Sequence, residues 1–266
     1  MCMGDNMLTD IFCGVMLPLL GTSIGAGCVY FMKSSLNLSV QNALAGFAAG
    51  VMTAASVWSL IIPAIDRCEH LGAFAFLPAV LGFWCGILFL FSVDRVMPFI
   101  SVNCRKAEGI IGRFQKTTML VFAVALHNLP EGMAVGAVYS AILSGDKNVS
   151  LSTAFALSLG IAIQNFPEGA IISMPLKAHG MRKGKAFAFG VLSGVVEPLG
   201  ALFTILLSVL VVPLLPWFLS FAAGAMIYVV IHELIPGLSE DNSSAAGVLS
   251  FSLGFSVMMA LDVALG

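Results

Sequence analysis

Long apolar stretches alternate with short polar connections along the whole chain. Stretches without an acidic or basic residue run over 11–32, 34–65, 71–93, 117–130, 148–167 and 198–232. A membrane-spanning helix needs about 20 predominantly apolar residues. The last stretch is too long for one helix, and Pro213 and Pro216 provide a break within it. The pattern predicts eight membrane-spanning helices, near 10–32, 42–64, 73–97, 117–142, 150–176, 185–211, 216–237 and 245–265.

The composition also indicates a lipid environment. The chain is 59% hydrophobic and 10% charged, whereas a soluble domain carries about 25% charged residues. Asp5 and Asp10 stand where a signal peptide has basic residues, so we expect the first helix to stay in the mature protein. The sequence predicts an all-α polytopic membrane protein in a lipid bilayer, a single domain over 1–266, with no nucleic-acid partner.

Basic residues predict the orientation of the helices, because lysine and arginine concentrate in cytosolic loops. With eight helices, the side that carries the odd-numbered connections holds ten of the twelve basic residues: Lys33, Arg95, Arg105, Lys106, Arg113, Lys116, Lys177, Arg182, Lys183 and Lys185. The other side holds only Arg67 and Lys147. Both termini are therefore predicted to lie outside the cytosol.

Two copies of one polar motif interrupt the central apolar stretches. They are HNLPEG at 127–132 and QNFPEG at 164–169. Each copy places a nitrogen or amide ligand four residues before a glutamate, and residues four apart share one face of a helix. His127 and Glu131 form one such pair, and Gln164 and Glu168 form the other. Polar groups are costly in a lipid interior and usually mark a transport path or binding site.

The two motifs together offer a mixed set of nitrogen and oxygen ligands. Pro130 and Pro167 lack an amide hydrogen, so each also frees a backbone carbonyl one turn earlier. Such a set suits Zn²⁺ and similar divalent ions and lacks the thiolates of a tight soft-metal site. The alternative is two kinked helices whose polar groups satisfy one another. The predicted ligands are His127, Asn128, Glu131, Gln164, Asn165 and Glu168.

Further polar groups lie in the predicted sixth, seventh and eighth helices. Glu197, beside Pro198, could complete the central site or bond to a neighbouring helix. His232 and Glu233 form another pair, but proline at position 236 replaces the second histidine of a zinc-protease HExxH motif. Asp262 lies near the outer end of the last helix, where an entrance carboxylate and a solvated helix end are both reasonable interpretations.

The motifs resemble those of the ZIP (Zrt/Irt-like protein) family of divalent metal transporters, and most of all its GufA-like branch, which includes the eukaryotic ZIP eleven proteins. The resemblance extends from the second predicted helix to the C-terminus. Its segments are SVWSLIIPAID (56–66), HNLPEGMAVG (127–136), IQNFPEGAIIS (163–173), LSGVVEPLG (192–200), FAAGAMIYVVIHELIP (221–236) and MMALDVALG (258–266).

This resemblance implies eight helices in a 3+2+3 arrangement, with an inverted repeat flanking the central pair; the helix count permits that symmetry. It implies a binuclear centre with one metal held by His127, Glu131, Gln164 and Glu168. The second metal would use Asn128, Asn165, Glu197 and a bridging glutamate, either Glu168 or Glu131. His232 and Glu233 would mark the cytosolic exit and Asp262 the outer entrance. Several relatives have aspartate where this chain has Asn165, which should weaken the second position.

The function expected is transport of Zn²⁺ into the cytosol by alternating access through the central site. The sequence does not rank zinc against Cd²⁺, Fe²⁺, Mn²⁺ or Cu²⁺. Two other hypotheses are an intramembrane metal-dependent hydrolase and a proton or monovalent-cation transporter that binds no metal. The short chain favours a bacterial plasma membrane. A homodimer is one option for the oligomeric state.

Overall fold

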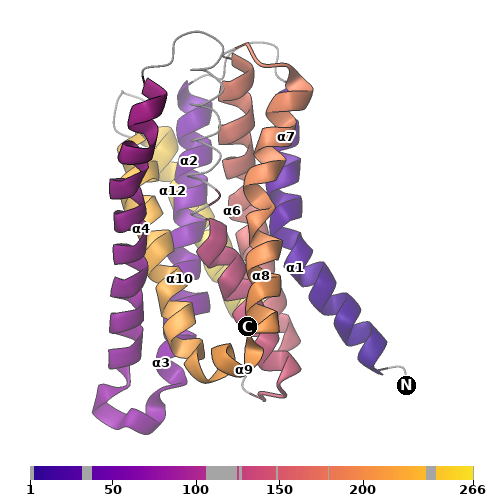
Figure 1. The fold of residues 1–266 in the computed structure, drawn as a ribbon, viewed down its shortest axis with the longest axis vertical. Helices are drawn as coiled ribbons and strands as arrows, with labels where there is room; N and C mark the ends of the chain where they lie inside the picture. The colour runs from indigo at the N-terminus through magenta and orange to yellow at the C-terminus, as the bar shows by residue number, and fades with distance from the viewer. Residues whose placement is uncertain are drawn as a thin grey trace.

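The protein is a bundle of long helices, as a computed structural model shows (Figure 1). The structure describes residues 3–31, 38–105, 125, 128–147, 149–178, 180–237 and 244–265. The principal helices are α1 (Met3–Gly27), α2 (Leu38–Ala55), α4 (Phe76–Arg105), α6 (Leu151–Ala178), α7 (Lys183–Gly194), α8 (Val196–Leu206), α10 (Leu215–Val229) and α12 (Ser244–Leu265). Residues 128–143 form a further helix. Shorter helical segments are η1 (Cys28–Tyr30), η2 (Ser56–Ile61), α3 (Ile62–Asp66), η3 (Glu69–Phe74), α9 (Ser208–Val211), η4 (Val212–Leu214), η5 (Val230–Leu234) and α11 (Ile235–Gly237).

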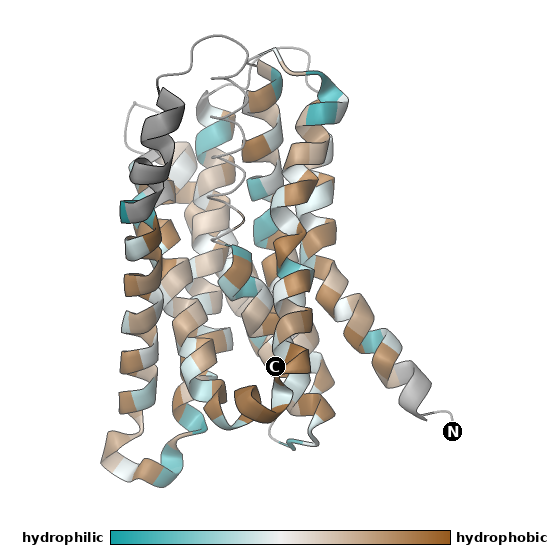
Figure 2. Cartoon of the chain, viewed as in Figure 1, coloured by the Kyte–Doolittle hydropathy of each residue, from teal (hydrophilic) through white to brown (hydrophobic). Residues whose placement is uncertain are grey.

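Seven helices in the described part of the chain are long and apolar enough to span a membrane. They cover Met7–Tyr30, Ser39–Asp66, Phe76–Arg95, Leu151–Ala178, Lys183–Leu206, Ser208–His232 and Ala245–Ala264. Each lies close to one of the predicted spans, and hydrophobic residues predominate along their lengths (Figure 2). The fourth predicted span, 117–142, falls largely outside the described residues, although its second half coincides with helix 128–143. The prediction of membrane-spanning helices is therefore confirmed for seven of the eight.

Two of these spans contain a π-helical turn near one end. In the first, η2 interrupts the path from α2 to α3, and in the second, η5 interrupts the path from α10 to α11. A proline follows each turn closely, Pro63 after η2 and Pro236 after η5. Because π-helical turns inside helices occur frequently at functional sites, both ends are candidate positions for functional polar contacts.

Helices α2 and α12 are packed almost backbone to backbone. A Cβ atom on Gly50 of α2 would collide with the carbonyl oxygen of Phe251, and one on Gly254 of α12 would collide with that of Phe47. Small residues permit this close approach between helices in membranes. The Phe-x-x-Gly segments of the two helices therefore cross each other reciprocally.

Helices α4 and α10 repeat the same crossing. A Cβ atom on Gly224 would collide with the carbonyl oxygen of Phe83, and one on Gly86 would collide with that of Phe221. The sequence FAAGVM at 47–52 of α2 returns as FAAGAM in α10. The two helix pairs thus share one packing design, although they lie far apart in the chain.

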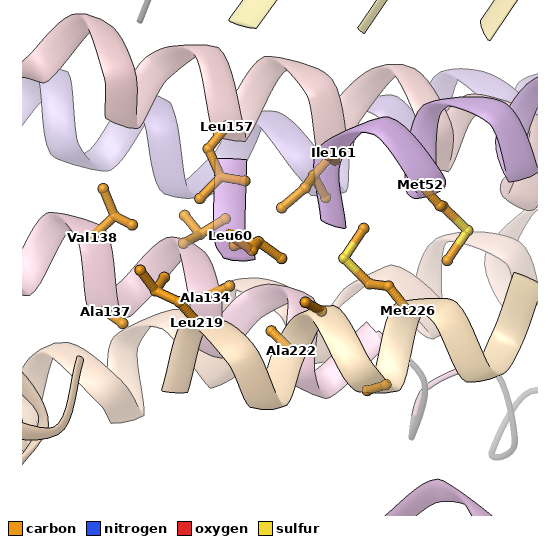
Figure 3. Close-up of a cluster of buried hydrophobic side chains, with 14 of the residues drawn as sticks. Met52, Leu60, Ala134, Ala137, Val138, Leu157, Ile161, Leu219, Ala222 and Met226 are labelled. Atoms are coloured by element: carbon orange, nitrogen blue, oxygen red, sulfur yellow. The ribbon is translucent and has the colours of Figure 1, made fainter. Parts of the chain in front are cut away.

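The apolar core joins these helices to those that carry the motifs. Figure 3 shows Leu60 of η2 close to Leu157 of α6, with α10 and helix 128–143 on the other side. The cluster includes Met52, Leu60, Ala134, Ala137, Val138, Leu157, Ile161, Leu219, Ala222 and Met226, all buried. Both motif helices therefore reach the protein centre through tightly packed apolar surroundings.

Candidate metal centre

The two motif helices bring their polar residues together inside the bundle. Glu131 of helix 128–143 accepts a hydrogen bond at Oε1 from Nε2 of Gln164, at 2.8 Å. Glu131 is 2% exposed, and Gln164 is fully buried. These are one residue from each motif, so the predicted convergence of the two copies is present in the structure.

A second polar pair links helix 128–143 to α8. Nδ2 of Asn128 donates to Oε1 of Glu197 at 2.9 Å and lies 3.4 Å from the carbonyl oxygen of Ser193. Glu197 is 1% exposed and follows the break between α7 and α8 at Val195. Pro198 cannot donate to the carbonyl of Gly194, which explains why the helix is interrupted beside the carboxylate. Glu197 therefore bonds to a neighbouring helix beside the two motifs, and its role in a metal site stays a prediction.

Helix α1 forms a third wall of the cluster, which no motif in the sequence predicts. Nδ2 of Asn165 donates to the carbonyl oxygen of Pro18 at 3.3 Å. The hydroxyl of Thr22 lies 3.3 Å from the same carbonyl and 3.5 Å from Oε1 of Glu197. Thr22 and Asn165 are fully buried. No recurring motif marks α1, so only the three-dimensional contacts reveal its role.

Among the residues that the structure describes, four buried oxygen atoms of this cluster have no hydrogen-bond partner. They are Oε2 of Glu131, Oε1 of Gln164, Oδ1 of Asn165 and Oε2 of Glu197. An unpaired buried acceptor costs about 1–3 kcal/mol, so four in one place need a common explanation. All four are oxygen ligands of the kind that divalent cations accept. A cation bound among them would satisfy them together.

The charges of the cluster reinforce this interpretation. Glu131 interacts electrostatically with Glu168 and Glu197, and Glu168 also interacts with Glu197. Glu168 is half-buried in α6 and has interactions of its own. Three carboxylates with no basic residue among their described hydrogen-bond partners are unstable in an apolar interior unless protons or a cation neutralise them.

One predicted ligand cannot be placed. His127 lies outside the described residues, so its approach to the cluster stays a prediction. Among the residues that the structure describes, no three histidine, cysteine, aspartate or glutamate side chains are grouped tightly enough to hold a metal by themselves. The described part of the site therefore depends on the amide oxygens of Gln164 and Asn165 as well as on carboxylates.

The predicted exit residue His232 lies in the π-helical turn η5. Its Nδ1 is 3.3 Å from Oδ2 of Asp94 in α4, and its side chain is 58% exposed. The hydroxyl of Tyr228 donates to the same aspartate oxygen at 2.7 Å, and the Tyr228 ring stacks on His232. Asp94 was not among the residues predicted for this pathway. The side chain of Glu233 is not among those described.

The predicted entrance residue Asp262 contacts the other π-helical turn. Ser59 of η2 donates to Oδ1 of Asp262 in α12 at 2.6 Å. The turn η2 follows α2 and contacts an aspartate of α12, the helix that crosses α2 at the glycines. In the same way, η5 follows α10 and contacts an aspartate of α4, the helix that crosses α10. The spacing agrees as well, since Asp94 stands eight residues after Gly86 and Asp262 stands eight after Gly254. In both places, a residue of a π-helical turn contacts an aspartate of the helix that crosses its span.

Comparison with known proteins shows the family of this chain. The family model described as "ZIP Zinc transporter" matches residues 105–262. This chain belongs to the ZIP family. It is 33% identical to zinc transporter ZIP11 of Xenopus tropicalis, with 97% of this chain and 100% of that protein covered. It is 35% identical to zinc transporter GufA of Myxococcus xanthus (93% and 96% covered) and 35% identical to zinc transporter ZIPB of Bordetella bronchiseptica (92% and 78% covered).

In this ZIP family member, an integral membrane protein, apolar side chains separate the polar cluster from one end of the bundle. Ile161 and Leu157 lie one and two turns before Gln164 in α6, and Ala134 and Val138 occupy the matching turns after Glu131. All four belong to the cluster in Figure 3. At 1.5 Å per residue, the seven residues from Glu131 to Val138 span about 10 Å. These buried apolar side chains therefore lie between the polar cluster and that end of the bundle.

Proposed function

We propose that this ZIP family protein carries Zn²⁺ across a membrane into the cytosol through the cluster of Glu131, Gln164, Asn165 and Glu197. The observation that supports the proposal is the set of four buried, unpartnered oxygen atoms on these residues. The amide nitrogens donate hydrogen bonds that hold the groups in place, while the second oxygen of each carboxylate and the oxygen of each amide stay available. The zinc-transporter names of its relatives agree with this substrate.

Within the cluster, we assign one metal position to Glu131, Gln164, Glu168 and His127. A second position would use Asn128, Asn165 and Glu197, with Glu168 as the bridging group. Glu168 interacts electrostatically with both Glu131 and Glu197, as a bridging group would, and Glu131 is the other candidate because it also interacts with both other carboxylates. Asn165 carries no charge, so the second position should bind more weakly and release its ion more readily.

Alternating access would require the metal-binding helices to move relative to the paired helices α2, α12, α4 and α10. The reciprocal Phe-x-x-Gly crossings support the view that these four paired helices stay fixed relative to each other while the metal-binding helices move. The apolar cluster that separates Glu131 from the end of the bundle would part during the outward-facing step. Fe²⁺, Mn²⁺, Cd²⁺ and Cu²⁺ fit the same oxygen and nitrogen donors and are candidate substrates.

The repeated crossings also support an eight-helix, 3+2+3 arrangement in one domain over 1–266. Helices α2 and α4 would correspond to α10 and α12, as expected for two three-helix halves in opposite orientation. We further propose that both termini face away from the cytosol. Lys177, Arg182, Lys183 and Lys185 flank the connection between α6 and α7, at the end of the bundle opposite to the chain termini (Figure 1).

Uptake into proteoliposomes loaded with a zinc-sensitive dye tests this function. The wild type should transport Zn²⁺, and the double variant Glu131→Gln/Glu197→Gln should lose nearly all uptake because both buried carboxylates lose their charge. Glu69→Gln, an exposed acid in η3, is the matched control and should behave as wild type. Equal uptake by the double variant and the control would refute the proposal. The transporter family disfavours the hydrolase hypothesis, and metal-free cation transport predicts no zinc dependence at all.

A further inference from the structure

The side of the cluster formed by α1 contains an unusual arrangement of one backbone carbonyl and one hydroxyl. The carbonyl oxygen of Pro18 lies within hydrogen-bond distance of both Asn165 Nδ2, at 3.3 Å, and Thr22 Oγ1, at 3.3 Å. Thr22 Oγ1 also lies 3.5 Å from Oε1 of Glu197. One turn of α1 thus touches two residues of the second metal position.

The carbonyl of Pro18 determines which way the amide of Asn165 points. Only the amide nitrogen can donate to a carbonyl oxygen; a flipped amide would place two acceptors against each other. Asn165 also interacts with Glu197, again as a donor. Both contacts hold the nitrogen, so Oδ1 is left as the buried acceptor without a partner. The backbone of α1 therefore turns a neutral residue into an oriented oxygen ligand.

Close packing keeps this turn of α1 in position. A Cβ atom on Gly169 of α6 would collide with the carbonyl oxygen of Thr22, and one on Gly194 of α7 would lie 2.8 Å from the Thr22 hydroxyl. Gly21 and Gly25 of α1 similarly meet the carbonyl oxygens of α6 residues. Thr22 is therefore clamped between α6, which carries Gln164 and Asn165, and the last residue of α7, three positions before Glu197 in α8.

We infer that Pro18 and Thr22 of α1 are positioning groups for the second metal position, Pro18 acting through Asn165 and Thr22 acting through Glu197. This inference deepens the proposed function and rests on it. Oε1 of Glu197 accepts from Nδ2 of Asn128 at 2.9 Å and lies 3.5 Å from the Thr22 hydroxyl, whose single proton it shares with the Pro18 carbonyl, so Oε2 is the carboxylate oxygen left for the cation. Loss of the Thr22 hydroxyl frees the carboxylate to rotate and should weaken the second ion while the first, at Glu131 and Gln164, is unaffected.

Equilibrium Zn²⁺ titration of the purified full-length protein tests the inference. The wild type should bind one tight and one weaker equivalent. Thr22→Val, which keeps the shape but removes the hydroxyl, should weaken the weaker equivalent about fivefold to tenfold and change the tight one by less than about twofold. Thr22→Ser, which restores the hydroxyl, should return the weaker equivalent to within about twofold of wild type. Thr22→Ala is a second hydroxyl-free variant in case the valine variant misfolds.

A double-mutant cycle separates positioning from general destabilisation. Thr22→Val combined with Asn165→Ala should cost less than the sum of the two single effects on the weaker equivalent, since both act on one position. The inference is overturned if the wild type binds a single equivalent, if Thr22→Val leaves both affinities unchanged, or if valine and serine weaken both equivalents alike. A wild type that binds no Zn²⁺ would instead refute the proposed function.

Discussion

An ion pair at one end of the bundle should control how readily the metal-binding helices move. Nη1 of Arg67, just after α3, lies 2.6 Å from Oδ2 of Asp146, just after helix 128–143. Asp146 is held by a turn in which its amide donates to the carbonyl of Ala141 at 3.0 Å, and Gly145 adopts the positive φ of 77° that this helix end requires. Both partners are therefore fixed to rigid segments. The pair ties the helix of Glu131 to the span that contains α2.

The burial of the pair sets the size of the expected effect. The side chains are 16% and 17% exposed, and Nη2 of Arg67 is buried without a partner. Exposed pairs contribute about 0.2–1 kcal/mol, whereas removing one partner of a buried pair costs about 3–5 kcal/mol. Loss of the pair should therefore destabilise this conformation by about 1–3 kcal/mol, a population shift of about 5-fold to 150-fold. Arg67→Gln and Asp146→Asn should both favour opening at this end.

Cys68 reports that opening directly. It is adjacent to Arg67 and only 3% exposed. In a variant that retains Cys68 as its single cysteine, labelling by a membrane-impermeant maleimide should accelerate at least about fivefold in Arg67→Gln. The charge-reversed double variant Arg67→Asp/Asp146→Arg should restore slow labelling. Equal labelling rates in the wild-type background and in Arg67→Gln, or failure of the charge reversal to restore protection, would refute the reasoning.

Three further predictions concern the frame, one end of the pathway and the thiol. Gly50→Ala should lower the Tm of the detergent-solubilised protein, because overpacking costs about 1–3 kcal/mol. The control Gly27→Ala, whose Cβ would meet no atom within 4 Å, should leave the Tm unchanged. Equal Tm values for the two variants would contradict the close crossing of α2 and α12. Ser59→Ala and Asp262→Asn should each reduce Zn²⁺ uptake, and their effects should be non-additive because the residues share one hydrogen bond; full additivity would show independent roles. Burial raises the pKa of the Cys68 thiol, so its thiolate fraction at neutral pH is low. The rate of maleimide labelling should therefore still increase with pH above the usual thiol pKa. A labelling rate that levels off near the usual thiol pKa would argue against burial.

The membrane-spanning segments could be predicted from the sequence because lipid allows few alternatives. A backbone without water must bond to itself, so apolar stretches of sufficient length become helices. The seven described spans lie close to their predicted positions for this reason. The π-helical turns at Ser56–Ile61 and Val230–Leu234 were not predicted, since a one-residue insertion in a helix leaves the hydropathy unchanged.

The central site was predictable in part. Matched motifs identified Glu131 and Gln164, and a proline beside an intramembrane carboxylate identified Glu197. Asp94 was missed because it stands at the end of a predicted span, where a charged residue requires no explanation. The corresponding sequences FAAGVM and FAAGAM were visible in the chain and could have located the repeated crossings.

Helix α1 shows the limit of pattern-based reasoning. A threonine in an apolar helix usually bonds to the carbonyl four residues earlier, as Thr22 does with Pro18. Its second contact, with Glu197, spans 175 positions of the sequence. No local spacing encodes such a contact, because it depends on how glycines let α1, α6 and α7 approach one another.

The most direct test of the account is the amount of Zn²⁺ bound at equilibrium by the purified protein with and without its buried carboxylates. The wild type should bind Zn²⁺, and Glu131→Gln/Glu197→Gln should lose more than about 100-fold in affinity, since loss of an outer-shell partner alone costs about 10-fold to 100-fold. The exposed-site control Glu69→Gln should bind as wild type does. Unchanged Zn²⁺ affinity in the double variant would contradict the claim that the four unpartnered oxygens form the transport site.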